Sequence, residues 1–290
     1  MEKKWDGKTK GSLWGYKFFV FCIKFFGIWF SYFFCLFVAT YFVLFARKQR
    51  NALVRFYQKG FHYSKPKAIW TATKNFNLFG RILIDRIALK TTKKKFYSHS
   101  FENEEALIEM KEAGKGGFLF SGHVGNWENA GNLIGERITN KINILMLDDE
   151  VEKIKSYISS ETEEAKFNLI PLKKDLSHLI LIHQALKRNE LIALHADRTM
   201  PNQKSYVLPF LEGKAEFPSG PFIMAHKFKV PITFVFAVKG EKTHYNLCAT
   251  NLLYQSESPE QIASAFVSKL EQMVKDNPTQ WFNFYDYYVN

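Results

Sequence analysis

Hydrophobic positions are distributed unevenly along this 290-residue chain. Residues 25–46 form an apolar run of 22 residues without a formal charge, and residues 18–23 extend it upstream, with one interruption at Lys24. At 1.5 Å per residue, a helix of this length covers about 33 Å, enough to cross a hydrocarbon core of about 30 Å. The pattern therefore predicts an N-terminal membrane helix over about residues 18–46, inside an anchoring segment formed by residues 1–60.

The remaining residues, 61–290, alternate short apolar runs with longer stretches in which apolar residues recur at helical spacing. The short runs predict strands at residues 117–121, 142–147, 168–172, 191–195 and 231–238. The longer stretches predict helices at residues 66–90, 102–112, 127–138, 151–164, 176–188, 220–228 and 259–275. Strands that alternate with helices favour an α/β fold, a mixed or mostly parallel sheet flanked by helices, in one catalytic domain.

Charge divides the chain in a similar way. Residues 1–100 contain 20 Lys and Arg against 3 Asp and Glu, whereas residues 101–290 contain 20 against 25. Aromatic residues make up 17% of the sequence, which excludes a disordered polycation. Nucleic-acid binding is not expected, because the basic part is also the apolar part and its aromatic residues do not interleave with the basic ones.

Basic residues flank the apolar run on both sides, so the positive-inside rule gives no orientation. The helix either spans the membrane or lies in one leaflet with its cations at anionic headgroups. A secretory signal peptide does not fit, because the run is too long and leads straight into Arg47 without a small-residue cleavage site. The separate basic run Lys93–Lys95 is either a solvated loop or a contact with headgroups or an acidic partner.

Three cysteines, Cys22, Cys35 and Cys248, have no metal-ligand spacing and would leave one thiol unpaired in any disulfide scheme. This favours a reduced, cytosol-facing protein, and we expect neither a metal site nor a cofactor.

The most informative segment, residues 116–128, reads GGFLFSGHVGNWE. A buried strand leads to His123, which lies where the chain leaves the sheet, the edge at which α/β proteins bind ligands. Glu128 follows five positions later, about 140° away on a regular helix. The two side chains therefore meet only if His123 precedes the helix and Glu128 points back from its first turns.

A histidine paired with a carboxylate is suited to general-base catalysis, because the carboxylate fixes the tautomer and stabilises the imidazolium. The segment has no nucleophile-elbow serine and no cysteine, so the His123–Glu128 pair would activate a hydroxyl brought by the substrate. The competing interpretation of His123 is a structural histidine. Neither His-Glu-x-x-His nor a cysteine cluster accompanies the pair, which argues against zinc.

The residues Ser-Gly-His123-Val-Gly-Asn-Trp-Glu128 resemble the His-x-x-x-x-(Asp/Glu) motif of the bacterial lipid A lauroyl/myristoyl acyltransferases, a branch of the lysophospholipid acyltransferase superfamily. The resemblance extends, in the same order, over residues 5–11, 41–47, 195–198, 209–221 and 277–286. The ending Trp-Phe-Asn-Phe-Tyr is closest to a subgroup that accompanies aryl-polyene and flexirubin-type clusters. The Leu-Glu-Gly of residues 211–213 departs from the commoner family pattern.

The resemblance implies a membrane-associated O-acyltransferase with a glycerolipid-acyltransferase-like fold. It would move a fatty acyl group from acyl carrier protein or coenzyme A to a hydroxyl of lipid A or another membrane lipid. His123 and Glu128 would be catalytic, and the enzyme would lie at the bacterial inner membrane with its catalytic domain facing the cytoplasm.

Three further residues are candidates for substrate binding under this resemblance. Asn126 is a candidate for the oxyanion site. Arg198 would hold a phosphate or sugar-lipid acceptor, or else pair structurally with Asp197 or another neighbour. Gly220 is either part of a helix start or a point where a ligand approaches the backbone.

Two alternatives belong to other functional classes. One is a hydrolase of lipid esters, which the missing nucleophile elbow disfavours. The other is a membrane-anchored, non-catalytic scaffold that binds lipid, which the intact His123–Glu128 pair disfavours.

Overall fold

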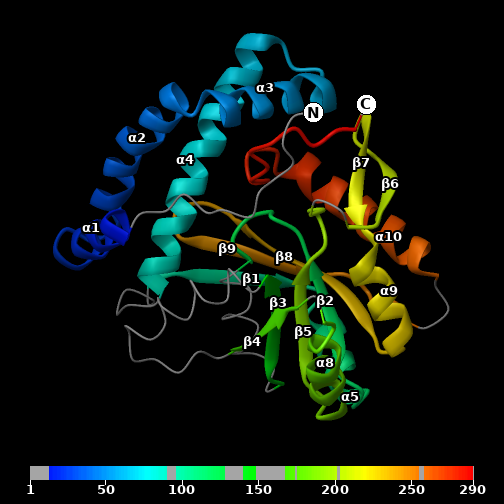
Figure 1. Cartoon of the computed structure of the whole chain (residues 1–290). Helices are drawn as coiled ribbons and strands as arrows, with labels where there is room; N and C mark the ends of the chain where they lie inside the picture. The colour runs from blue at the N-terminus through cyan, green and yellow to red at the C-terminus, as the bar shows by residue number, and fades with distance from the viewer. Residues whose placement is uncertain are drawn as a thin grey trace.

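A seven-stranded mixed sheet forms the centre of the protein in the computed structural model, which describes residues 13–89, 96–127, 140–147, 167–173, 175–200, 203–254 and 258–289 (Figure 1). The strand order is β1-β9-β8-β2-β5-β3-β4, and all neighbours are parallel except β8 and β9. The strands are β1 (Ser98–Glu102), β2 (Gly117–Ser121), β3 (Ile142–Leu147), β4 (Phe167–Leu172), β5 (Leu191–His195), β8 (Ile232–Lys239) and β9 (His244–Ala249). The predicted α/β fold with a mixed sheet is confirmed.

Four strands were not predicted from the sequence, namely β1, β6 (Ser205–Phe210), β7 (Gly213–Pro218) and β9. β1 has the sequence SHSFE and pairs with β9 at an edge of the sheet that the described residues form. Its side chains are exposed or half-buried, which is why it has no apolar run. The strands β6 and β7 form a separate antiparallel hairpin. Half-exposed strands bury one face or less, and their sequences therefore lack the continuous hydrophobic signal of β2 or β8.

The helices of the catalytic part match the predicted periodicity closely. They are α4 (Lys65–Leu89), α5 (Glu105–Glu112), α8 (His178–Lys187), α9 (Ser219–Phe228) and α10 (Pro259–Asp276). The helix predicted from residue 102 begins only at residue 105, because Glu102 belongs to β1. The helices predicted at 127–138 and 151–164 lie outside the described residues, apart from Trp127.

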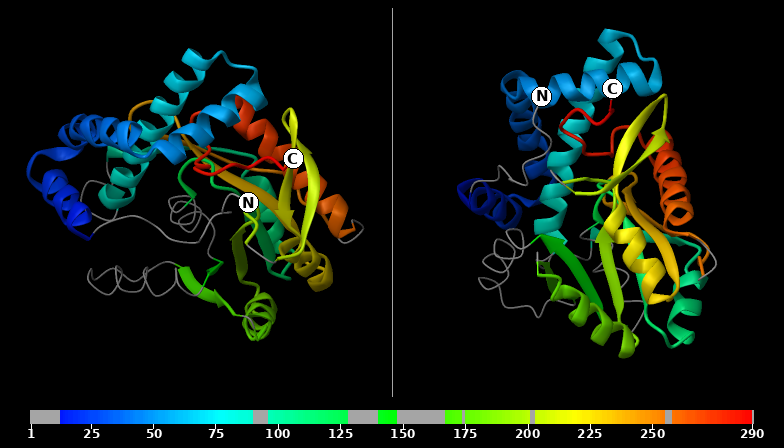
Figure 2. Two further views of the ribbon diagram at one scale, coloured as in Figure 1. Left: turned by 45° about the horizontal axis from the view of Figure 1, so that its top comes forward. Right: turned by 45° about the vertical axis from the view of Figure 1, so that its right-hand side comes forward.

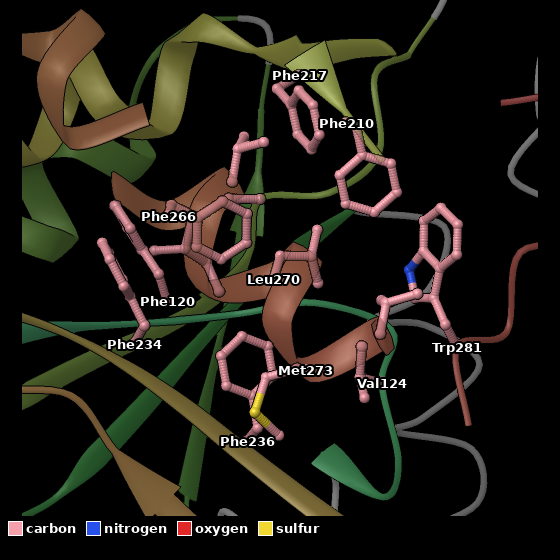
Figure 3. Packing of buried hydrophobic residues seen from close by; sticks show 14 of the residues in the cluster. Phe120, Val124, Phe210, Phe217, Phe234, Phe236, Phe266, Leu270, Met273 and Trp281 are labelled. Carbon is pink, nitrogen blue, oxygen red and sulfur yellow. The ribbon is translucent and has the colours of Figure 1, made fainter. Parts of the chain in front are cut away.

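Alternate side chains of the central strands face two different layers. Phe118 and Phe120 of β2 pack in the main core with α8, α9 and α10, whereas Leu119 packs in a second core with α5. Figure 3 shows Phe120 and Phe234 of the sheet against Phe266 of α10. The two cores sandwich the sheet, and the carboxyl ends of its central strands remain available for a site.

The N-terminal apolar segment is divided, which corrects the single helix predicted over about residues 18–46. It forms α1 (Leu13–Phe25) and α2 (Gly27–Phe45), separated where Gly27 adopts a φ of +82°. This left-handed conformation ends the first helix and lets the chain turn back. Phe18 of α1 consequently contacts Phe34 of α2, with ring centroids 4.8 Å apart.

The first helices pack against α4. Residues Ile28, Tyr32 and Cys35 of α2 share a buried cluster with Ile84 and Ile87 of α4. Figures 1 and 2 show α1, α2 and α3 (Arg47–Phe61) gathered at one end of the molecule, with α4 running from them down toward the sheet. Among the described helices, α2 is long and apolar enough to cross a membrane, by length and composition only.

Helix α3 contributes to the core of the catalytic part. Its residues Leu53, Phe56 and Tyr57 are buried in the main cluster, and the Tyr57 hydroxyl donates a hydrogen bond of 2.8 Å to the carbonyl oxygen of Pro278. The domain boundary at residue 60 stays a prediction, and the structure places residues on its N-terminal side in direct contact with the C-terminal segment.

Candidate active site

His123 lies directly beyond the carboxyl end of β2, as the sequence predicts. β2 is buried along its whole length and pairs in parallel with β5, in a register that sets Ser121 beside His195. Parallel neighbours end at the same edge of a sheet, so the residues that follow β2 and β5 meet there. His123 and Asp197 are those residues.

The Asp197 carboxylate is the hydrogen-bond partner of His123. One of its oxygens, Oδ1, lies 2.7 Å from Nδ1 of the His123 imidazole, and the other, Oδ2, accepts the His123 backbone N–H at 2.8 Å. Asp197 is 1% exposed, whereas the His123 side chain is 21% exposed. Because a carboxylate only accepts hydrogen bonds, Nδ1 is assigned the proton, and Nε2 then presents its lone pair.

The electrostatic environment keeps this pair in the state that a general base requires. Burial and the positive charge of Arg198 lower the pKa of His123, and the opposing effect of Asp197 is smaller. Burial raises the pKa of the Asp197 carboxyl, but His123 and Arg198 outweigh it and hold that pKa below its usual range. At neutral pH the site therefore contains a neutral imidazole beside an ionised carboxylate.

A second histidine lies against the first. The ring of His195 is 4.4 Å from that of His123, and Trp127 packs edge-on against His195 with ring centroids 4.6 Å apart. The guanidinium of Arg86 lies 5.0 Å from the centroid of the Trp127 ring. Burial and the neighbouring His123 lower the pKa of His195 well below its ordinary value, so both imidazoles are neutral.

The C-terminal segment closes the site from a distant part of the sequence. The Trp281 indole N–H donates to Asp197 Oδ2 at 3.2 Å, and the Phe282 N–H donates to the His123 carbonyl oxygen at 3.0 Å. Trp281 is 1% exposed and packs beside Val124 and Phe210 (Figure 3). The signature around residue 281 thus helps to orient the His123–Asp197 pair.

Gly125 allows the chain to turn immediately after His123. It adopts a φ of +65°, and a Cβ atom there would lie 2.1 Å from the Ala237 carbonyl oxygen. Its N–H donates to the Gln280 carbonyl oxygen at 2.8 Å. Only glycine combines this conformation with so close an approach to β8.

Arg198 lies near the pair, as its effect on the pKa of His123 indicates. Its Nη2 donates a hydrogen bond of 2.6 Å to the carbonyl oxygen of Phe282. The expected alternative, a structural pairing with a neighbour, is thus observed with a backbone carbonyl, and the role in acceptor binding stays a prediction.

Asn126 is fully buried, and both ends of its side-chain amide are engaged. Nδ2 donates to the Tyr245 hydroxyl at 3.2 Å, and Oδ1 accepts from Nε of Arg86 at 3.3 Å. Gly220 is exposed in the first turn of α9, with nothing within 4 Å of a Cβ built there. The roles of Asn126 in an oxyanion site and of Gly220 in ligand binding stay predictions.

Glu128 lies outside the described residues, so the predicted His123–Glu128 contact is untested. The sequence reasoning overlooked the contact with Asp197, which it considered only as a neighbour of Arg198. The available signal was the position of Asp197 two residues past a predicted strand. In the part of the chain that the structure describes, no three His, Cys, Asp or Glu side chains are grouped as metal ligands would be.

Comparison with known proteins identifies the family of this chain. Curated protein sequences give no significant match. The family model described as bacterial lipid A biosynthesis acyltransferase matches residues 2–288, nearly the whole chain, including the His123 loop, Asp197 and the C-terminal segment. The chain therefore belongs to the bacterial lipid A biosynthesis acyltransferase family and is an acyltransferase.

Proposed function

We propose that this acyltransferase moves a fatty acyl group from a thioester of acyl carrier protein or coenzyme A to a hydroxyl group of a membrane lipid, with His123 as the general base. The observation that carries the proposal is the His123–Asp197 contact of 2.7 Å at the carboxyl end of β2. It gives the enzyme a base with a buried carboxylate behind it. Membership of the family supports the acyl transfer, and the base supplies a way to perform it.

The chemistry follows from the tautomer. Nε2 of His123 takes the proton of the acceptor hydroxyl while its oxygen attacks the thioester carbonyl carbon. The new C–O bond gives a tetrahedral intermediate, the C–S bond then breaks, and the departing thiolate takes the proton back from the imidazolium. Asp197 stabilises the imidazolium between these steps, and general-base catalysis of this kind contributes about 10²–10⁴-fold to the rate.

A nucleophile on the enzyme is not required. All three cysteines are buried, and the hydroxyl of Ser121, the serine nearest in sequence, donates to the Gly122 carbonyl oxygen at 3.5 Å. The base therefore serves the substrate hydroxyl, which distinguishes acyl transfer from hydrolysis through an acyl-enzyme.

Glu128 remains part of the proposal as a second acidic residue of the site. Because Asp197 already pairs with Nδ1 of His123, Glu128 would contribute to acyl transfer without replacing that contact. Arg198 would attract a phosphate group of the acceptor, because its guanidinium is a permanent positive charge with forked donors and directly follows Asp197 in the chain.

The test uses purified full-length protein, extracted bacterial lipids, and a radiolabelled fatty acyl group attached as a thioester to acyl carrier protein or to coenzyme A. His123→Ala should reduce transfer at least about 100-fold, because it removes the general base. His183→Ala, an exposed histidine on α8, is the matched control and should transfer normally. Transfer by His123→Ala at a near wild-type rate would overturn the mechanism.

The same assay identifies the donor and the acceptor. Mass spectrometry of the labelled product distinguishes three acceptors: lipid A, a pigment and another membrane lipid. A pigment is included because the C-terminal residues resemble those of the aryl-polyene and flexirubin-type subgroup. We propose an inner-membrane location with the catalytic domain facing the cytoplasm, where acyl carrier protein and coenzyme A thioesters are made.

We further propose that α1 and α2 insert into one leaflet as a folded-back pair. The side of α2 away from α4 exposes large apolar side chains, and α1 adds more. They include Phe21, Phe25, Phe26, Trp29, Phe33, Phe37, Tyr41, Leu44 and Phe45. An exposed apolar surface of this kind, on a pair of helices already packed on α4, suits insertion into acyl chains.

Charge supports the same arrangement. The sequence contains no acidic residue between Asp6 and Asp85, and α3 carries Arg47, Lys48, Arg50, Arg55 and Lys59. Arg55 pairs with Asp286 at 2.7 Å, so the attraction to headgroups is assigned to the other four. Anionic headgroups attract such a surface by about 1 kcal/mol for each basic residue near the membrane.

Vesicle flotation tests the membrane proposal. Replacing Phe33 and Phe37 together with Ser should weaken binding to vesicles that contain phosphatidylglycerol, because both rings would leave the acyl region. The matched control replaces Ile180 and Leu181, exposed on α8, with Ser and should bind normally. Insertion in one leaflet also puts the N-terminus and the catalytic domain on the same side of the membrane. If a membrane-impermeant label reached the two from opposite sides, the helix would instead span the membrane.

A further inference from the structure

Asp85 of α4 is unusual in both sequence and position. It is the only acidic residue between residues 7 and 101, and it is completely buried. A carboxylate withdrawn from water is costly unless charged or polar partners surround it. The partners of Asp85 therefore show how the cost of burying its carboxylate is compensated.

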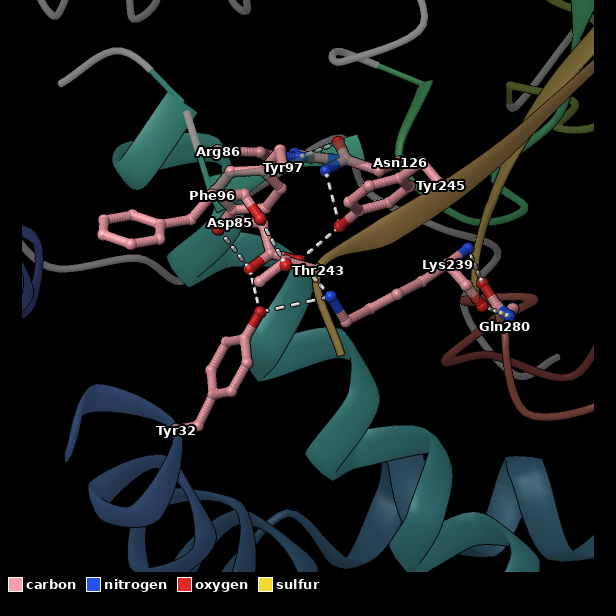
Figure 4. A network of polar contacts seen from close by, with 10 residues as sticks. All are labelled: Tyr32, Asp85, Arg86, Phe96, Tyr97, Asn126, Lys239, Thr243, Tyr245 and Gln280. Carbon is pink, nitrogen blue, oxygen red and sulfur yellow. Dashed lines mark hydrogen bonds and ion pairs between the residues drawn. The ribbon is translucent and has the colours of Figure 1, made fainter. Parts of the chain in front are cut away.

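Four side chains from different elements converge on Asp85 (Figure 4). Lys239 of β8 lies 2.7 Å from its Oδ2, and the Tyr97 hydroxyl donates to Oδ1 at 2.8 Å. Tyr32 of α2 and Tyr245 of β9 also donate their hydroxyl hydrogens to the carboxylate. The cluster thus joins the apolar helix α2 to α4 and to strands β8 and β9 of the sheet.

Stability alone is a weak reason for this cluster. Burial lowers the pKa of Lys239 although Asp85 opposes the shift, which reflects the cost of burying the ammonium group. A buried ion pair is often no more stabilising than apolar residues of similar volume. A better-attested role of buried ion pairs is to specify one arrangement of the elements that they connect.

Two hydrogen-bonded paths lead from the cluster to the loop that carries His123. In the first, Tyr245 accepts from Asn126 Nδ2 at 3.2 Å, and Asn126 lies three residues after His123. Arg86, the neighbour of Asp85 on α4, donates to the other end of that amide at 3.3 Å (Figure 4). The Arg86 guanidinium also lies over the Trp127 ring.

The second path runs through the backbone of Lys239. Its N–H donates to Gln280 Oε1 at 2.8 Å, and its carbonyl oxygen accepts from Gln280 Nε2 at 2.7 Å. The Gln280 carbonyl oxygen in turn accepts the Gly125 N–H at 2.8 Å. Both paths therefore end within three residues of His123.

We propose that Asp85, Tyr32 and Tyr245 are positioning residues that couple the seating of α2 to the geometry of the His123 loop. This inference rests on the proposed function, because it assigns the chain Tyr32–Asp85–Tyr245–Asn126 a role in acyl transfer. Acyl transfer then proceeds fastest when α2 is packed in the arrangement that these hydrogen bonds define.

The test removes single hydroxyl groups and preserves the rings. Tyr32→Phe and Tyr245→Phe should each lower kcat about 3- to 10-fold, the effect of one lost hydrogen bond on the alignment of the site. KM for the acyl thioester should stay unchanged. Tyr254→Phe removes an exposed hydroxyl outside the cluster and outside the proposed membrane surface, and it should leave kcat unchanged.

The double variant distinguishes coupling from two separate defects. If both hydroxyl groups act through Asp85, Tyr32→Phe combined with Tyr245→Phe should lower kcat by less than the product of the single effects. A purely structural role would lower the melting temperature of the variants but leave kcat of the folded enzyme at the wild-type value. That result would overturn the proposal.

A spectroscopic measurement keeps this inference separate from the proposed function. Protein labelled with 5-fluorotryptophan and bound to phosphatidylglycerol vesicles gives a ¹⁹F resonance for Trp127, assigned by Trp127→Phe. Tyr32→Phe should shift this resonance and Tyr254→Phe should not. If wild type transfers no acyl group, the proposed function fails, whereas an unmoved resonance in Tyr32→Phe refutes the coupling.

Discussion

Replacing Asp197 with Asn tests the assignment of the catalytic pair most directly. The substitution preserves the shape of the side chain but leaves one oxygen, where the carboxylate uses two. Oδ2 accepts the His123 backbone N–H and the Trp281 indole N–H, and Oδ1 faces Nδ1 of His123. If the amide oxygen keeps the first two donors, its NH₂ group faces Nδ1.

That arrangement changes the tautomer of His123. Nδ1 must then accept a hydrogen bond, so the proton moves to Nε2, the nitrogen that should take the proton of the acceptor hydroxyl. The imidazolium also loses its buried counter-ion. Breaking a buried ion pair costs about 3–5 kcal/mol, which corresponds to a decrease in kcat of about 10²- to 10⁴-fold.

The assay measures kcat with saturating acyl thioester and vesicles of extracted lipid, beside the melting temperature of each variant. Asp276→Asn, an exposed aspartate at the end of α10, is the matched control and should keep wild-type kcat. A kcat of Asp197→Asn within threefold of wild type, in a folded protein, would refute the role of Asp197. A large loss in Glu128→Gln alone would then assign the orientation of His123 to Glu128.

Three further predictions concern pH and two glycines. Because the pKa of His123 is lowered and the base must be neutral, kcat/KM should fall as the pH decreases, with a midpoint below 6.5, the ordinary pKa of histidine; a midpoint above pH 6.5 would contradict this. Gly125→Ala should destabilise the protein by more than about 1 kcal/mol in urea unfolding, because its Cβ would meet the Ala237 oxygen at a positive φ. Gly220→Ala should raise the free energy of unfolding by about 0.5–1 kcal/mol, because its Cβ meets no atom within 4 Å; a raised KM instead would support ligand approach at Gly220.

Local sequence patterns were sufficient for much of the fold. The buried strands β2 and β8 are continuous apolar runs, and the helices α4 and α10 have helical hydrophobic periodicity, so their positions follow from the residues alone. The polar edge strand β1 lacks that signal because it is held by pairing with β9, which is distant in the chain. The strands β6 and β7 pair with each other in a local hairpin and are only partly buried, so their residues show no continuous apolar run. The turn at Gly27 was missed because an apolar run has the same composition whether it is straight or folded back.

The sequence by itself determined that His123 follows a buried strand and that an apolar, basic segment precedes a catalytic part. The tertiary structure decided which carboxylate meets His123, because Asp197 is 74 residues away in sequence and reaches His123 through the pairing of β2 with β5. It also decided that Trp281 completes the site and that Asp85 is buried among residues of α2, β8 and β9. Side-chain periodicity reports burial one segment at a time, whereas hydrogen-bond partners are chosen only when distant segments pack together.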